Sequence, residues 1–234
     1  MSILLDAGII LLFAIFIVSG LKRGLVRSLI GFVATVIAIV LSMYLSKIAS
    51  IFIYDNFIKN NLLVQINDIL NEYVGRDLNE KTAAVFNELP KILSNTLMFC
   101  GVTSNVVGDV IENSTGNASY ELVKLFSPTI ISVIRTILVP FIFIVIYTPL
   151  NFLNRVIGRI FRVPGLRQID QVLGAIIGAL KGFLLIVLIT FLLKMFLPMM
   201  SNIPDIFSKN TIESTFLFKE FYRNNIIYDF LQSE

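Results

Sequence analysis

Long apolar runs along the chain predict four membrane-spanning helices. The runs cover about residues 3–21, 28–46, 133–154 and 172–197. Each is long enough, at 1.5 Å per helical residue, to cross a hydrocarbon layer of roughly 30 Å. They pair into two hairpins, so the sequence predicts an all-α polytopic membrane protein. Its domains are a first hairpin (1–47), an extracytoplasmic helical segment (48–127), a second hairpin (128–197) and an extracytoplasmic amphipathic tail (198–234).

The middle segment and the tail show helical periodicity without being apolar throughout. Apolar residues recur every three or four positions between Leu62 and Tyr73, and again from Val85 to Leu97 with Pro90 as a helix break. Residues 113–119 (NSTGNAS) indicate a turn before the third span. In the tail, apolar residues between Leu217 and Leu231 share one helical face. That helix either packs against the bundle, which we favour, or lies in the outer membrane interface.

Basic residues concentrate in the two short connections between spans. Seven of the 19 lysines and arginines lie there: Lys22, Arg23, Arg27, Arg155, Arg159, Arg162 and Arg167. The segment 47–127 instead has 6 basic and 9 acidic residues. By the positive-inside rule, both basic loops face the cytoplasm, and both termini and the middle segment lie outside. Topology and anionic lipid explain these charges, so no nucleic-acid partner is expected.

Composition argues against enzyme chemistry. The chain is 56% hydrophobic and 15% charged, and it has no histidine and one cysteine, Cys100. A histidine relay, a thiolate cluster and an internal disulfide are therefore excluded. We expect no catalytic residue, no metal site and no cofactor, and we expect Cys100 to be buried as a small apolar residue.

Glycines at four-residue spacing predict close helix packing. Gly174, Gly178 and Gly182 form a glycine zipper on the fourth span, and Gly20 and Gly24 make a similar series at the end of the first. Small residues let two helix backbones approach closely where lipid gives no hydrophobic drive. The partner is either another helix of this chain, which we favour, or a second copy.

Four ionisable residues lie within or beside the apolar runs: Asp6, Arg135, Lys181 and Lys194. Charges in a membrane are costly and suggest function by default. In a functional interpretation Asp6 pairs with Arg135 or Lys194, or belongs to a polar path. In the other interpretation, each residue is an anchor at head-group level, where a lysine stem can snorkel.

Two segments resemble the colicin V production protein family of bacterial membrane proteins. They are SGLKRGLVRSLIGFVATVIA (19–38) and IDQVLGAIIGALKGFLL (169–185). The matching positions are Asp6, Gly20, Gly24, Gly174, Gly178, Lys181 and Gly182. Gln171 departs from the pattern, because family members often have arginine there. The resemblance implies a four-span protein of the bacterial inner membrane linked to production or export of a peptide toxin, with no established catalytic residue.

These features favour a non-enzymatic membrane protein that acts as a scaffold or assembly partner in secretion or envelope homeostasis. Its expected partners are the lipid bilayer and either itself or other envelope proteins, and no small-molecule ligand can be assigned. The alternative is an oligomeric channel or transporter for ions or small solutes. In that case Asp6, Arg135 or Lys181 lines a water-filled path.

Overall fold

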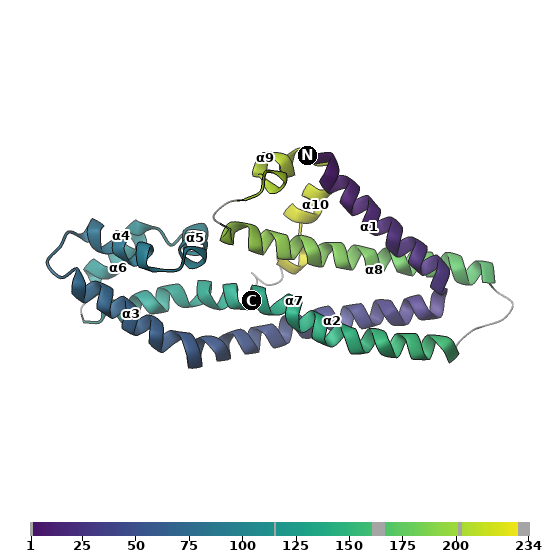
Figure 1. Cartoon of the computed structure of the whole chain (residues 1–234), viewed down its shortest axis with the longest axis horizontal. Helices are drawn as coiled ribbons and strands as arrows, with labels where there is room; N and C mark the ends of the chain where they lie inside the picture. The colour runs from purple at the N-terminus through teal and green to yellow at the C-terminus, as the bar shows by residue number, and fades with distance from the viewer. Residues whose placement is uncertain (1, 115, 161–166, 201–202, 229–234) are drawn as a thin grey trace. The chain divides into compact units, whose positions relative to one another are not determined.

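The computed structural model describes residues 2–114, 116–160, 167–200 and 203–228, and within these ranges the secondary structure is entirely helical. Four helices contain stretches long and apolar enough to cross a membrane (Figure 1). They are α1 (Ser2–Arg23), α2 (Leu25–Ile53), α7 (Ala118–Ile160) and α8 (Arg167–Phe196). The predicted all-α class with four spans is confirmed.

Two of these helices extend well beyond their apolar stretches. Helix α2 continues through a π-helical turn, η1 (Tyr54–Ile58), into α3 (Lys59–Glu72), which gives an apolar-to-amphipathic run of 48 residues. Helix α7 has 43 residues, or roughly 65 Å at 1.5 Å per residue. The sequence pattern missed its first turns because residues 118–132 are amphipathic rather than continuously apolar.

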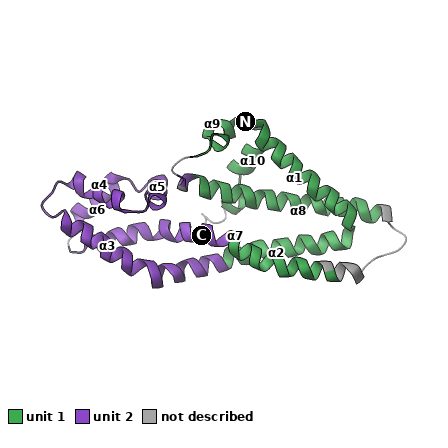
Figure 2. Cartoon of the chain, in the orientation of Figure 1, with its two compact units in different colours: residues 1–44, 140–197, 203–234 green, residues 45–139, 198–202 purple. Residues whose placement is uncertain are grey.

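The chain divides into two compact units, which are coloured separately in Figure 2. Unit 1 comprises residues 1–44, 140–197 and 203–234, and unit 2 comprises residues 45–139 and 198–202. Helices α2 and α7 each contribute one part to each unit. The tail from residue 203 belongs to unit 1 together with α1 and α8.

Unit 2 has a core built from short amphipathic helices and the first half of α7. The short helices are α3, α4 (Leu78–Glu88), α5 (Lys91–Phe99) and α6 (Ser104–Asn113). Pro90 is the N-cap of α5, so the predicted break lies where the sequence placed it. The centre of the core is formed by fully buried residues, namely Ile66, Val85, Leu97, Val107 and Phe126.

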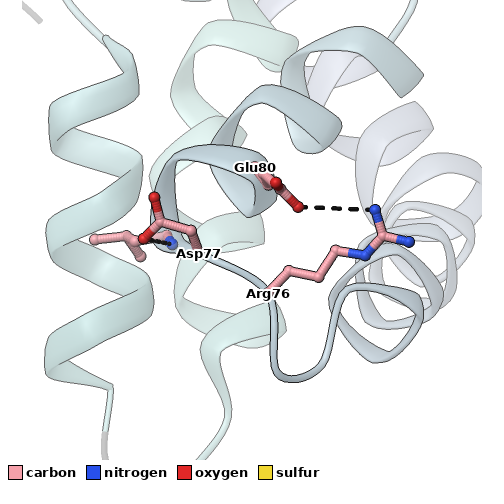
Figure 3. Close-up of polar contacts among 4 residues, drawn as sticks. Arg76, Asp77 and Glu80 are labelled. Atoms are coloured by element: carbon pink, nitrogen blue, oxygen red, sulfur yellow. Dashed lines mark hydrogen bonds and ion pairs between the residues drawn. The ribbon is translucent and has the colours of Figure 1, made fainter.

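Local polar contacts fix the turn between α3 and α4 in unit 2 (Figure 3). Gly75 has a φ of +82°, a conformation that favours glycine. Asp77 then caps α4, because its Oδ1 accepts a hydrogen bond from the Leu78 N–H at 2.8 Å. Arg76 pairs with Glu80 at 3.7 Å, in an exposed i,i+4 ion pair that contributes little to stability.

The expectation for Cys100 was wrong. This residue is the C-cap of α5, and its side chain is exposed. The helix ends in a turn at Gly101, with a φ of +84°, so Cys100 lies outside the buried face that Leu97 occupies.

In unit 1, α1 and α8 lie side by side, and the tail packs against both. The described part of the tail has a 3-10 turn, η3 (Asp205–Phe207), and the short helices α9 (Lys209–Glu213) and α10 (Phe218–Arg223), and residues 226–228 are again helical. The predicted amphipathic helix is therefore interrupted after Arg223. Ile212 and Phe218 from these helices join Ile9 of α1 and Ile186 of α8 in a small apolar cluster. Of the predicted tail face, Leu231 lies outside the described residues.

Candidate functional site

The predicted glycine series meet each other across α1 and α8. A Cβ added to Gly20 would overlap the carbonyl oxygen of Gly174, and one added to Gly178 would overlap the carbonyl oxygen of Phe16. Gly182 is less tightly enclosed, since its nearest neighbour would be the Phe16 Cβ at 3.1 Å. The backbones of α1 and α8 are therefore in direct contact at Gly20, Gly174 and Gly178, because these residues have no side chain to hold the helices apart.

Gly24 and Asp170 close the turn between α1 and α2. Gly24 has a φ of +77°, and a Cβ there would also collide with the Asp170 carboxylate. That carboxylate accepts a hydrogen bond from the Leu25 N–H at 2.8 Å. Asp170, 145 positions away along the chain, thus caps the N-terminus of α2 in the way that a local aspartate usually does.

Substituting Asp170 tests this cap. We expect Asp170→Ala to lower the free energy of unfolding by about 1 kcal/mol, because the α2 N-terminus loses its acceptor. Asp170→Asn is the matched control and should change it by only a few tenths, since asparagine caps nearly as well. Thermal unfolding of the purified protein in mild detergent, followed by circular dichroism, measures both. Equal losses for the two variants would contradict the capping role.

Asp6 binds the N-terminal end of the tail helix α10. Its two carboxylate oxygens accept backbone hydrogen bonds from Phe216 at 2.8 Å and from Leu217 and Phe218 at 2.9 Å. An anion at this position also complements the partial positive charge of a helix N-terminus. Asp6 therefore fastens the tail to α1 across more than 200 residues of sequence.

Lys194 holds the opposite end of the same tail helix. Its Nζ donates to the carbonyl oxygen of Arg223, the last residue of α10, at 3.0 Å, and lies 4.0 Å from the centre of the Tyr228 ring. The buried Asn225 adds a further anchor, because its Nδ2 donates to the Val187 carbonyl oxygen at 2.9 Å. Two of the four ionisable residues singled out in the sequence thus act on one helix. A third, Arg135, belongs to unit 2.

Lys181 is the fourth, and it is buried, with 6% of its surface exposed. Its Nζ donates to the Tyr147 hydroxyl at 2.9 Å and lies 5.1 Å from the centre of the same ring. Asn154 is close by and 1% exposed. A Cβ added to Gly31 would be 2.8 Å from Asn154 Nδ2 and 3.6 Å from Lys181 Nζ. The three polar side chains come from α7 and α8, and Asn154 and Lys181 lie next to Gly31 of α2.

Two of the predicted basic-loop residues lie at this cluster. Arg23 and Arg27 line a small cavity together with Lys181, whereas Lys22 is exposed and does not line it. Arg155, Arg159 and Arg167 are in described helices, but their side chains, like all of Arg162, lie outside the described part of the structure. Within that part, no group of three or more histidine, cysteine, aspartate or glutamate residues could hold a metal ion.

Sequence reasoning missed Tyr147, Asn154, Asp170 and Asn225 as partners in these contacts. Asn154 is the one with a usable signal, because an amide at the end of an apolar run is expensive to bury unless something binds it. Asp170 and Asn225 are ordinary polar residues near helix ends, and Tyr147 lies inside α7. Nothing in their spacing identifies the helix that they touch.

The fold and these contacts define an all-helical membrane protein whose intramembrane charges are held by tertiary contacts. The model of the family described as "Colicin V production protein" matches residues 96–225, more than half of the chain. The chain therefore belongs to the colicin V production protein family. The match includes the segment 169–185 on which the resemblance rested, and the segment 19–38 lies outside it. No curated protein and no solved structure matches the chain.

Proposed function

We propose that this protein is a non-enzymatic scaffold or assembly partner in the bacterial inner membrane, serving secretion or envelope homeostasis. The observation that supports this role most directly is that Asp6 and Lys194 form structural contacts. Both side chains bind the ends of α10, so they stabilise architecture instead of lining a path. The family's association with colicin V production agrees with a role in secretion and names no reaction.

The proposed topology places unit 2 and the tail outside the cytoplasm. The charge distribution supports this arrangement, because the seven basic residues of the two short connections would remain on the cytoplasmic side. Unit 2 then presents α4, α5 and α6 to extracytoplasmic partners. The contacts between Gly20 and Gly174 leave this glycine zipper occupied within one copy of the chain, so partners would bind elsewhere.

A channel or transporter is the competing function. The cavity beside Lys181 has a volume of about 10 Å³, which is room for one water. A single copy therefore provides no solute path there, and transport would require several copies. Flux of ions across liposomes that contain purified protein, lost on Lys181→Met, would favour the channel over the scaffold.

The exposed Cys100 of unit 2 gives a direct test of the scaffold. A membrane-impermeant maleimide carrying a photo-crosslinker is applied to cells with a permeabilised outer membrane, and the tagged chain is then isolated. We expect Cys100 to be labelled, because the proposed topology places unit 2 outside. After illumination, we expect discrete adducts of higher mass that contain a second envelope protein or a second copy.

Cys100→Ser is the matched control, since it removes the only sulfhydryl in the chain. We expect it to leave the fold unchanged, because the Cys100 side chain is exposed. Failure to label Cys100 in cells with a permeabilised outer membrane, with labelling after lysis of the inner membrane, would overturn the topology. Two results together would count against the scaffold. One is that Cys100 is labelled but gives only the adducts that the control also gives, and the other is that no partner is captured from native membranes.

A further inference from the structure

Helix α5 of unit 2 has an exposed face that is mainly apolar. Ile92, Met98 and Phe99 are 54%, 51% and 63% exposed. At about 100° per residue, all three lie within about one third of the helix circumference, together with Lys91 and Asn95. Lys91 is exposed and is the only charged residue of α5. Large apolar side chains therefore make up most of the surface that this helix presents to its surroundings.

The hydroxyl side chains of α5 are buried instead. Ser94 and Thr96 lie on the inner side of the helix with Leu97. The Ser94 hydroxyl donates to the Lys91 carbonyl oxygen at 3.3 Å, and the Thr96 hydroxyl donates to the Ile92 carbonyl oxygen at 2.7 Å. Both hydroxyls are thus satisfied within the helix and need no water. This arrangement differs from that of a helix in water, whose polar residues face the solvent.

The other short helices of unit 2 have polar exposed faces. The exposed residues of α4 and α6 are asparagine, serine, aspartate and glutamate, with Ala83 as the smallest side chain among them. On α3 they are asparagine, glutamine, aspartate and glutamate, with Val64 as a single exception. An isolated exposed apolar residue is ordinary, whereas a contiguous apolar face marks a contact with a membrane or a protein. Helix α5 is the one that carries such a face.

A lipid bilayer is the apolar surface nearest to unit 2, because unit 2 continues into three spans. Helix α2 enters it at Leu45, and α7 leaves it after Val139, which already lies within the apolar run 133–154. Pro198, which also belongs to unit 2, directly follows the apolar stretch of α8. The exposed apolar side chains of α2 likewise continue into unit 2 as far as Phe52.

Within unit 2, α5 lies on the side of this membrane connection. Figure 2 shows it closer than α4 and α6 to the end at which α2 enters the unit and α7 leaves it. Leu93 of α5 and Ile134 of α7 pack against the same buried cluster, and Ile134 belongs to the apolar run of the third span. The apolar face of α5 is therefore continuous with the part of unit 2 that contacts lipid.

We propose that α5 is an interfacial helix that inserts Ile92, Met98 and Phe99 into the surface of the lipid bilayer. Lys91 fits this orientation, because its stem can lie along apolar surface while its ammonium reaches the lipid phosphates. The inference goes beyond the scaffold role and holds for either side of the membrane, so its failure would leave the proposed function and topology untouched. The polar faces of α4 and α6 remain available to protein partners.

The chain has no tryptophan, so Phe99→Trp introduces a single fluorescent reporter on the proposed contact face. The full-length variant is reconstituted into liposomes of phosphatidylcholine and phosphatidylglycerol, with bromine on the acyl chains as the quencher. We expect emission at a shorter wavelength than in water, and quenching at a depth of about 5–10 Å, as for other interfacial helices. Ala83→Trp, on the exposed polar face of α4, is the matched control, and aqueous iodide should quench it instead.

Removing the other two apolar side chains tests whether the face inserts as a unit. Ile92→Ser combined with Met98→Ser, in the Phe99→Trp chain, should lower the equilibrium constant for insertion about tenfold, because each change removes apolar surface from the contact. Val64→Ser is the matched control, since Val64 is 61% exposed on α3, and it should leave the quenching unchanged. All of these side chains are exposed, so circular dichroism should show every variant to be folded.

Quenching of the Phe99→Trp reporter by brominated lipid, lost with Ile92 and Met98, would support the proposal. Quenching by iodide alone would show that the face is in water and would overturn it. An apolar environment that neither quencher reaches, and that disappears when the protein is diluted into excess lipid, would identify a second copy as the occupant and would also overturn it. Equal quenching of the two reporters by lipid would overturn the assignment to α5.

Discussion

Gly20→Ala is expected to destabilise the protein by about 1–3 kcal/mol, the usual range for overpacking a close contact. The added methyl group would overlap the Gly174 carbonyl oxygen, which belongs to the backbone of α8 and cannot rotate away. Gly178→Ala should behave similarly, because its methyl group would meet the Phe16 carbonyl oxygen. Thermal unfolding in mild detergent, followed by circular dichroism at 222 nm, measures the loss.

Two other glycines of the same helices provide graded controls. A Cβ on Gly8 of α1 has nothing within 4 Å, so Gly8→Ala should be neutral or slightly stabilising through helix propensity. Gly182→Ala should fall between, because its neighbour at 3.1 Å is a side-chain atom of Phe16 that can shift. If Gly20→Ala and Gly8→Ala had the same effect, α1 and α8 would not be in backbone contact.

Asp6→Ala is expected to release the tail from α1. The substitution leaves three backbone N–H groups without their charged acceptor, which we expect to cost about 2 kcal/mol and to raise the open population of the tail roughly 30-fold. Trypsin can cut the opened tail at Lys209, Lys219 or Arg223. Limited proteolysis of the purified protein should therefore remove the tail much faster than in the wild type.

The control for this experiment is Asp170→Ala, which removes an acid from the same unit but acts at the N-terminus of α2. Its tail should be cut at the wild-type rate. Lys194→Gln should give a smaller increase than Asp6→Ala, since it removes one hydrogen bond to α10 where Asp6 accepts three. An unchanged cutting rate in Asp6→Ala would show that apolar packing alone holds the tail.

The contacts tested by these experiments show which features a single helix reveals in its own sequence and which depend on residues far along the chain. Both glycine series were visible in the sequence because four-residue spacing places side chains on one helical face. Packing within the chain was favoured, but the contact of Gly20 with Gly174 was not visible, since the same series could also pack against a second copy. Asp6 showed a similar limit. The sequence showed that a carboxylate in an apolar run is costly. It did not show that Asp6 accepts hydrogen bonds from the tail backbone, 210 positions away.

In unit 2, the amphipathic pattern of the sequence predicted some helices and missed others. The periodicity from Leu62 to Tyr73 predicted a helix that the structure contains as α3, and Pro90 begins α5 as its chemistry suggests. Helix α6 and the first turns of α7 were missed. Neither segment is continuously apolar, and a helix as short as α6 depends on packing against its neighbours. Val107 of α6 and Phe126 of α7 lie in the same buried cluster.

The sequence by itself determined the all-helical class, the four spans and the family resemblance. It could do so because a bilayer requires long apolar helices whose backbone hydrogen bonds are satisfied internally, and such helices are recognisable one at a time. Only the tertiary structure decided that Asp6 and Lys194 hold the two ends of α10, and that Lys181 lies with Tyr147 and Asn154. Those pairings depend on how each helix is rotated and where it crosses its neighbour. Spacing along a single helix carries no information on either.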